Sequence, residues 1–133
     1  MNKYMLDTDT SSEFIRGNKK VTQKIAENIG EGQLNLSVIT YYEMLSGFFY
    51  RDARSQLVRF EELMSFSKIL QLTSRSAKIA ATIEADLRKK GTVIGHTDTL
   101  IAGIAMANDL QLVTNNTAHF KRIKGLEITN WVK

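Results

Sequence analysis

Four polar residues follow predicted strands or open a predicted helix, where their side chains would be able to act together. Asp7 follows an apolar run, Glu43 comes just after an alternating run, Asp98 opens a helical pattern, and Asn116 follows a third apolar run. If the runs are parallel strands, their exits meet at one edge of a sheet. Carboxylates gathered there stay ionised together only when a cation offsets their repulsion. The pattern therefore predicts a metal site formed by the acidic residues.

The residue types limit which metal such a site would bind. The chain has no Cys and only two His, so the expected ligands are oxygens, which favour Mg²⁺ or Mn²⁺ over Zn²⁺. A hard cation of this kind suits phosphate substrates, because it lowers the pKa of a bound water and neutralises charge developing on the scissile phosphate. The expected chemistry is phosphoester hydrolysis, which requires no covalent intermediate.

Each acidic residue also has a purely structural interpretation. Thr40 and Glu43 have the spacing of a capping box, in which both side chains bind backbone amides at a helix start. Asp98, beside Thr97, would cap its helix, and Asp7 would open an Asx-turn. Taken one at a time, these roles compete well with metal binding. Only the joint placement of the acids favours a site.

The two histidines and the aromatic residues are left outside the predicted site. His96 and His119 lie far apart in the sequence without a ligand-spacing motif, so we expect surface or packing roles for both. The aromatic residues Tyr41, Tyr42 and 48–50 fall at helical spacing. They predict core or a protein interface rather than a platform for stacking bases.

The elements that would position these residues alternate between strand and helix. Short strands are predicted at residues 3–7, 34–38, 69–72, 112–114 and 126–128. Helices are predicted at residues 21–29, 41–50, 53–66, 76–90 and 98–108, with Thr40 as the cap of the second and a short turn at 118–122. This alternation predicts an α/β fold in which a mostly parallel central sheet is flanked by helices on both faces.

Length and composition fit one soluble domain over residues 1–133. Hydrophobic residues make up 43% and charged residues 24% of the chain, which is ordinary for a globular protein of this size. The longest segment without Asp, Glu, Lys or Arg has 11 residues, whereas a membrane-spanning helix needs ~20 mostly apolar ones. Without Cys or a signal-peptide pattern, we expect a cytoplasmic protein with no membrane partner.

The charge balance points to polyanions as partners. The formal net charge is +4, and basic residues cluster at 19–20, 88–90 and 121–124, which suits nucleic-acid binding. The cluster at 88–90 fits the C-terminus of a helix equally well, because cations there complement the helix dipole. Charge alone therefore decides little.

Several segments, in the same order along the chain, resemble PIN-domain toxins of the VapC type, the ribonuclease half of bacterial toxin–antitoxin pairs. The segments are residues 4–10 (Tyr-Met-Leu-Asp-Thr-Asp-Thr), residues 37–47, and residues 98–103 together with 112–116. Residues 125–131 resemble the usual ending of the family. The resemblance covers nearly the full length.

The resemblance implies a function and a set of partners. Asp7, Glu43 and Asp98 would be the acidic ligands of an Mg²⁺ or Mn²⁺ centre in an endoribonuclease, with Asn116 completing the catalytic set. The family has a three-layer α/β/α fold, forms homodimers, and is held by a cognate antitoxin whose tail occupies a groove beside the catalytic cleft. We expect the substrate to be a loop in tRNA or rRNA, where unpaired bases leave the backbone accessible.

Two positions depart from the family's pattern. Asp9 stands where Asn is common. It would either add a carboxylate near the metal or take over the same hydrogen-bonding role, and we expect the second. Asn116 and His119 stand where a fourth acid is often found. Asn116 would orient a metal-bound water through its amide oxygen, but the site then carries less negative charge, which disfavours a second metal.

Two other functions stay open. An Asp-x-Asp after an apolar strand also opens phosphatases of the haloacid dehalogenase type, in which the first Asp is the nucleophile. Against this, Ser11 stands where those enzymes usually have Thr, and no late pair of acids follows. The other alternative is a non-catalytic module with the PIN fold, which would bind RNA or a partner without cleaving RNA in added Mg²⁺ or Mn²⁺.

Overall fold

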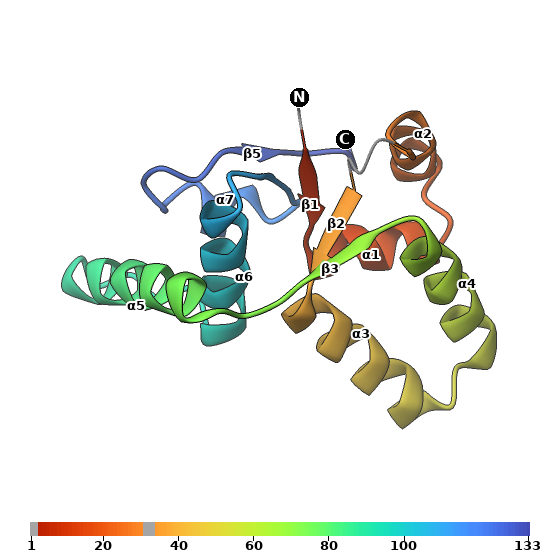
Figure 1. The fold of residues 1–133 in the computed structure, drawn as a ribbon, viewed down its shortest axis with the longest axis horizontal. Coiled ribbons are helices and arrows are strands. Elements are labelled where there is room, and N and C mark those ends of the chain that lie inside the picture. The colour runs from red at the N-terminus through yellow and green to blue at the C-terminus, as the bar shows by residue number, and fades with distance from the viewer. Residues whose placement is uncertain (1–2, 31–33) are drawn as a thin grey trace.

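A parallel sheet lies at the centre of the protein, as the computed structural model shows for residues 3–30 and 34–133 (Figure 1). Within these ranges the strand order is β3-β2-β1-β4-β5, and each neighbouring pair is parallel. The strands are β1 (Tyr4–Leu6), β2 (Leu34–Ser37), β3 (Lys68–Leu70), β4 (Gln111–Val113) and β5 (Ile128–Thr129). The predicted α/β fold with a mostly parallel sheet is confirmed.

Helices cover both faces of this sheet. In the described ranges they are α1 (Thr8–Ile15), α2 (Lys19–Glu27), α3 (Val38–Arg51), α4 (Arg54–Ser65), α5 (Ser74–Lys89), α6 (His96–Ala107) and α7 (Thr117–Phe120). Figure 1 shows α5, α6 and α7 on one side of the strands and α1 to α4 on the other, which gives three layers. None of the helices in these ranges has the length and apolar character required to cross a bilayer.

Two hydrophobic cores, one on each face, hold the layers together. Successive side chains of a strand point to opposite faces, so Met5 of β1 packs in the core under α5 and α6, and Leu6 packs in the core under α1, α3 and α4. Leu112 and Val113 of β4 divide in the same way, and all four side chains are fully buried. Burial on both faces explains why these strands are continuous apolar runs in the sequence.

The strands end together at the carboxyl edge of the sheet. Leu6 of β1 lies opposite Val113 of β4 in the register, and the backbone amide of Asp7 donates to the carbonyl of Val113 at 3.0 Å. On the other side of β1, strand β2 ends with Ser37. The chain builds β2 and β3 outward on one side of β1 and returns to build β4 and β5 on the other. The junction of β1 and β4 is thus a topological switch point, where sites form in such sheets.

Two helix starts change the role predicted for a residue near the candidate site. Helix α3 begins at Val38, because Oγ of Ser37 accepts the amide of Thr40 at 3.0 Å. The cap is therefore Ser37, and the prediction of Thr40 as the cap is wrong. Helix α6 begins at His96, so Asp98 lies within its first turn and the capping interpretation of Asp98 is also wrong. The other predicted elements are present, with their ends displaced.

Close packing of α5 against α6 fixes the helix that carries Asp98. At Gly103 of α6, an added Cβ would lie 2.6 Å from the carbonyl oxygen of Ser76 and 2.9 Å from the Cβ of Ala80. Only a residue without a side chain lets the two helices approach this closely. The position of Asp98 relative to the sheet therefore depends on the contact between α6 and α5 at Gly103.

Candidate active site

Asp7 is placed by the end of β1 and is almost fully buried, with 4% of its surface exposed. Its Oδ1 accepts the amide of Thr10 at 2.8 Å and so caps α1, which bears out a local structural role for this residue. Burial raises the pKa of Asp7 from 3.8 to about 6, although hydrogen bonds from the Thr114 and Thr10 side chains and the Thr10 amide oppose the rise. The carboxyl is therefore held in a place where its charge is costly.

Glu43 lies in the second turn of α3 and points across to α1. Its Oε1 accepts a hydrogen bond of 2.6 Å from the hydroxyl of Thr8, and this hydroxyl is 3.1 Å from that of Thr40. The amide of Thr40 is already bound by Ser37. The capping box proposed for Thr40 and Glu43 is therefore wrong, and the Glu43 carboxylate is directed toward the end of β1.

Asp98 lies beside His119, for which the sequence predicts a surface or packing role. Its Oδ2 is 3.5 Å from Nδ1 of His119, and the same nitrogen is 2.9 Å from Nδ2 of Asn116. Burial raises the pKa of Asp98; contact with His119 lowers it, and the charges of Glu43 and Asp9 raise it further. Asp98 thus lies within electrostatic reach of Glu43, although the two come from different helices.

The acidic side chains share one edge of the sheet without forming a closed ligand cage. Among the residues that the structure describes, no three His, Asp or Glu side chains converge closely enough to hold an ion directly. Mg²⁺ retains several waters and commonly uses only one or two carboxylates, so a loose set of oxygens suits it better than it suits Zn²⁺. The raised pKa of buried Asp7 also indicates a carboxylate that a nearby cation would stabilise. The donor set therefore fits a hydrated hard cation.

Comparison with known proteins identifies the family. The PIN domain model matches residues 4–126 of the chain. The chain belongs to the PIN domain family. Among curated relatives, the tRNA(fMet)-specific endonuclease VapC of Salmonella typhimurium is 34% identical over 98% of this chain and 99% of its own length. The protein of the same name from Shigella flexneri is 32% identical with the same coverage of each chain.

Solved structures agree with this assignment. A DNA-bound VapBC complex from Salmonella typhimurium matches this PIN domain with a TM-score of 0.89 and 32% identity, covering 98% of this chain and 99% of that one. VapBC2 of Rickettsia felis, bound to a promoter fragment, also has a TM-score of 0.89, at 26% identity and 96% and 98% coverage. The predicted family is confirmed, and the curated relatives of this chain carry the names of VapC endonucleases and ribonucleases. The haloacid dehalogenase alternative is wrong.

Sequence reasoning missed three side chains that contact the acidic residues at the carboxyl edge of the sheet. The hydroxyl of Thr8 binds Glu43, the hydroxyl of Thr114 binds Asp7, and His119 lies against Asp98. Thr8 and Thr114 each lie within two residues of a predicted strand end. Attention to hydroxyls as well as carboxylates at strand exits would have found both. Nothing in the local sequence marks His119, because its contact with Asp98 depends on how α7 folds back.

Asp9 does not take the role that was expected for it. It is exposed in the first turn of α1, and its side chain makes no hydrogen bond to any residue in the described ranges. Its negative charge nevertheless acts on the site. It is among the smaller causes that raise the pKa of Asp7 and of Asp98. Asp9 thus adds negative charge at the rim of the site.

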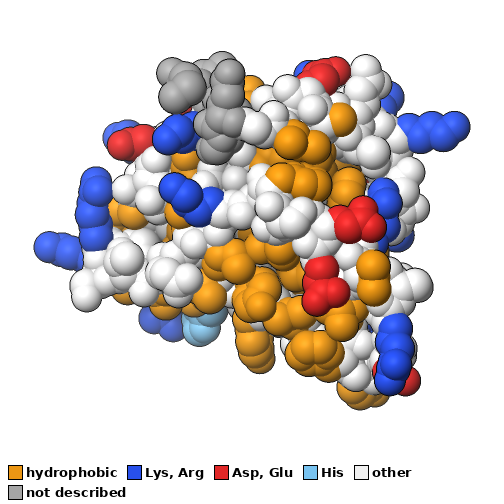
Figure 2. Space-filling model, turned by 45° about the vertical axis from the view of Figure 1, so that its right-hand side comes forward, with side chains coloured by type: hydrophobic (Ala, Val, Ile, Leu, Met, Phe, Trp, Pro, Cys, Tyr) orange, Lys and Arg blue, Asp and Glu red, His pale blue; other side chains and the backbone are white. Residues whose placement is uncertain are grey.

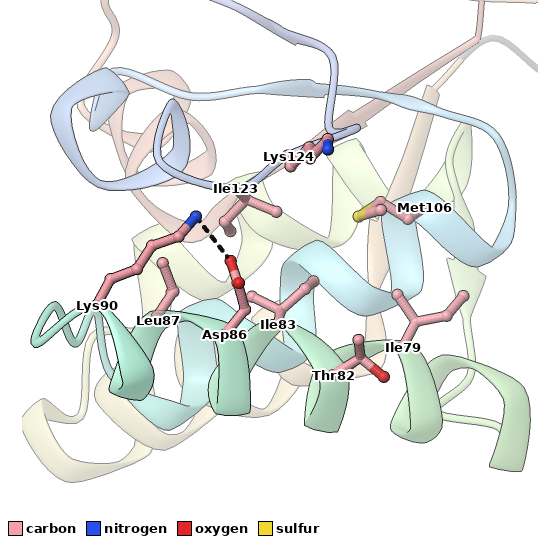
Figure 3. A pocket seen from close by; sticks show the side chains of 9 residues that line it. All are labelled: Ile79, Thr82, Ile83, Asp86, Leu87, Lys90, Met106, Ile123 and Lys124. Carbon is pink, nitrogen blue, oxygen red and sulfur yellow. Dashed lines mark ion pairs between the residues drawn. The ribbon is translucent and has the colours of Figure 1, made fainter.

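A separate cavity of the PIN domain lies away from these acids. It has a volume of about 440 Å³ between α5, Met106 and the Ile123–Lys124 segment, and an ion pair of 3.1 Å between Asp86 and Lys90 lies at its rim (Figure 3). Arg88 likewise pairs with Glu84 at 3.1 Å. Two cations of the basic cluster at 88–90 therefore pair with acids of α5 at its C-terminal end, as expected for a helix terminus. The candidate site is the polar sheet edge, not this cavity.

Proposed function

We propose that this chain is the toxin of a VapC-type pair and hydrolyses RNA at the carboxyl edge of its sheet, with Mg²⁺ as the metal and Mn²⁺ as a substitute. The observation that carries the proposal is that Asp7 directly follows β1, that the next residue, Thr8, binds Glu43, and that the charge of Glu43 acts on Asp98 at the same edge of the sheet. Nucleases of the PIN family generally depend on divalent metals. The combination of family and oxygen-rich edge supports a hydrolytic site there.

The three carboxylates would hold the cation, in part through water. When bound, a divalent cation activates a water as nucleophile and neutralises charge on the phosphate. Asp7 contributes a buried charge fixed by the amide of Thr10. Glu43 contributes an oxygen fixed by α1. Asp98 is steadied by His119, and the amide oxygen of Asn116 is free to accept a hydrogen bond from water or RNA, because its nitrogen faces the histidine.

The proposed substrate is a structured RNA with an unpaired loop, such as tRNA or rRNA, in the cytoplasm. Two relatives of this chain are named tRNA(fMet)-specific endonucleases, and the net charge of +4 favours a polyanion. An unpaired loop leaves its backbone accessible to a site at the surface of a sheet edge.

A cognate antitoxin is the proposed protein partner, and the face of α3 and α4 is the proposed contact. Phe49, Tyr50 and Val58 expose most of their surfaces, and a groove of about 450 Å³ runs beside Leu57. Figure 2, which views the molecule from this side, shows hydrophobic side chains gathered over a broad area with acidic groups among them. Exposed apolar patches of this kind mark interaction surfaces, and the related VapBC structures are toxin–antitoxin assemblies.

The decisive experiment combines RNA cleavage with loss of one carboxylate. Purified protein, free of antitoxin, is incubated with total RNA and with purified tRNA, in Mg²⁺, in Mn²⁺ and in EDTA. We expect discrete fragments with either metal and none in EDTA. The Asp98→Asn variant should be folded and inactive. Equal cleavage by wild type and Asp98→Asn would contradict the proposed site, and RNA binding without cleavage would favour the non-catalytic alternative.

A further inference from the structure

We infer that Thr8 is a positioning residue of the acidic site, whose hydroxyl holds one carboxylate oxygen of Glu43 and leaves the other available to a divalent cation. The inference deepens the proposed function and rests on it. Its starting point is the hydrogen bond of 2.6 Å from Thr8 Oγ1 to Glu43 Oε1. A bond this short between a hydroxyl and a carboxylate is of the charge-assisted kind, which is about twice as strong as a bond between neutral groups.

The hydroxyl of Thr8 contacts a second hydroxyl, which in turn contacts a third. Oγ1 of Thr8 is 3.1 Å from Oγ1 of Thr40, which accepts at 3.3 Å from Oγ of Ser37. A hydroxyl has one proton to donate. Because Thr8 donates its proton to Glu43, the bond between the two threonines must run from Thr40 to Thr8.

The hydrogen bonds of these hydroxyls all run in one direction. Ser37 donates to Thr40, Thr40 to Thr8, and Thr8 to Glu43, so the chain ends on a group that only accepts, as a carboxylate does. Hydrogen bonds arranged head to tail polarise and strengthen one another. Ser37 and Thr40 are fully buried, which shields the inner part of the chain from competing water.

These hydrogen bonds join two helices that carry or adjoin proposed ligands. Thr8 is the first residue of α1 and directly follows Asp7, whereas Glu43 lies on α3, and α1 and α3 are separate elements packed against the same core. A glutamate side chain has several free torsions, and fixing it costs conformational entropy. The hydroxyl of Thr8 supplies this constraint from the residue next to Asp7, a proposed ligand, so one hydrogen bond ties the Glu43 carboxylate to the end of β1.

The second carboxylate oxygen of Glu43 stays available. Within the described ranges, Oε2 takes part in no hydrogen bond or ion pair, whereas Oε1 is occupied by Thr8. This is the arrangement seen when an outer residue orients a metal-binding carboxylate: one oxygen is held and the other faces the ion. Loss of such an outer partner typically reduces metal affinity or activity about 10–100-fold.

The test compares hydroxyl removal with hydroxyl retention at position 8. Thr8→Val removes the donor and keeps the branched shape, and Thr8→Ser keeps the donor. Ser12→Ala is the matched control, because Ser12 also contacts α3, through Met44 Sδ at 3.6 Å, but does not touch an acidic residue. Thermal unfolding verifies the fold of each variant. Mn²⁺ binding to the RNA-free protein is followed by electron paramagnetic resonance, and kcat and KM for RNA cleavage are measured over a range of Mg²⁺ concentrations.

We expect Thr8→Val to bind Mn²⁺ more weakly or to lose kcat by about 10–100-fold, with KM for RNA nearly unchanged. Thr8→Ser and Ser12→Ala should stay close to wild type. If Thr8→Val does not fold, Thr40→Val replaces it, since this variant removes the donor to Thr8 and should shift Mn²⁺ binding in the same direction. Folded Thr8→Val with wild-type Mn²⁺ binding and kcat would overturn the inference alone. A wild-type protein that neither binds Mn²⁺ nor cleaves RNA would instead overturn the proposed function and the inference with it.

Discussion

The Nδ1 atom of His119 lies 3.5 Å from Oδ2 of Asp98. The same nitrogen is 2.9 Å from Nδ2 of Asn116, so one imidazole nitrogen contacts two residues of the proposed site. When Nδ1 carries a proton it donates to Asp98, and when it does not it accepts from the amide of Asn116. His119 therefore links the start of α7 to the first turn of α6.

Replacement of His119 should weaken the site without unfolding the protein. The side chain is 41% exposed, so His119→Ala should unfold like wild type, while RNA cleavage should fall by about 10–100-fold because Asp98 loses its partner. His96→Ala is the control, since His96 is more exposed and lies near Glu84 rather than Asp98. The measurement is the rate of RNA cleavage by wild type, His119→Ala and His96→Ala in saturating Mg²⁺. Equal rates for His119→Ala and wild type would remove His119 from the site.

An acid at position 119 should strengthen metal binding. His119→Asp adds a carboxylate beside Asp98, where related toxins often carry a fourth acid. In the absence of metal, like charges should raise the pKa of Asp98 further. At pH 8 the added charge should instead favour Mn²⁺ binding, which calorimetric titration of the RNA-free protein would detect. Weaker Mn²⁺ binding by His119→Asp than by wild type would contradict a cation at this edge.

The sequence was sufficient for the family, the alternation of strands and helices, and the carboxylates at the strand exits. It was not sufficient for the contacts between those exits. The start of α3 was predicted too late because Leu34, Leu36 and Val38 alternate as in a strand, whereas the hydroxyl of Ser37 ends the strand by capping the helix. Short polar caps override a hydrophobic pattern that fits either element.

Interactions between distant residues were the part that sequence patterns could not supply. Thr8 and Glu43 are brought together by the packing of α1 against α3, and His119 reaches Asp98 only because α7 follows β4 at the switch point. Neither contact has a local spacing signature. Prediction of such pairs requires the orientation of whole helices, which a strand or helix pattern does not fix.

The buried charge of Asp7 should destabilise the metal-free protein at neutral pH. Its pKa is about 6 in the folded chain against an ordinary 3.8, so between these values the folded state binds more protons than the unfolded state. The contribution of Asp7 to stability is therefore full below pH ~4 and is lost as pH rises through ~6. In EDTA at pH 8, Asp7→Asn should be more stable than wild type by on the order of 2–3 kcal/mol.

Urea unfolding at pH 4 and pH 8 would measure this difference at fixed protein concentration. Glu61→Gln, which removes an exposed carboxylate on α4, is the control and should behave as wild type at both values. Asp7→Asn should at the same time abolish RNA cleavage. Lower stability of Asp7→Asn at pH 8 would mean that the charge is stabilised by groups other than a bound cation.

The contact between α5 and α6 should tolerate no side chain at Gly103. Its Cβ would meet the backbone oxygen of Ser76 at 2.6 Å, so Gly103→Ala should cost about 1–3 kcal/mol through overpacking. Gly47→Ala in α3 is the matched control, because its Cβ would meet only the flexible end of Arg51 at 3.2 Å. That change should be neutral or stabilising by up to ~1 kcal/mol. Urea midpoints of the two variants should therefore move in opposite directions or differ clearly, and equal midpoints would contradict the close approach.

Exposed aromatic residues of α3 should contribute to antitoxin binding and little to folding. Phe49 and Tyr50 are 65% and 91% exposed, so Phe49→Ser and Tyr50→Ser should change the free energy of unfolding by only about 0.5 kcal/mol. Aromatic side chains at the centre of an interface commonly contribute about 2 kcal/mol or more to binding, which corresponds to a roughly 30-fold weaker complex for at least one variant. Val93→Ser is the control, because Val93 is 60% exposed but lies in the loop between α5 and α6. Dissociation constants with the purified cognate antitoxin would show which of the two surfaces it contacts. A loss of affinity confined to Val93→Ser would indicate that the antitoxin binds on the opposite face of the sheet.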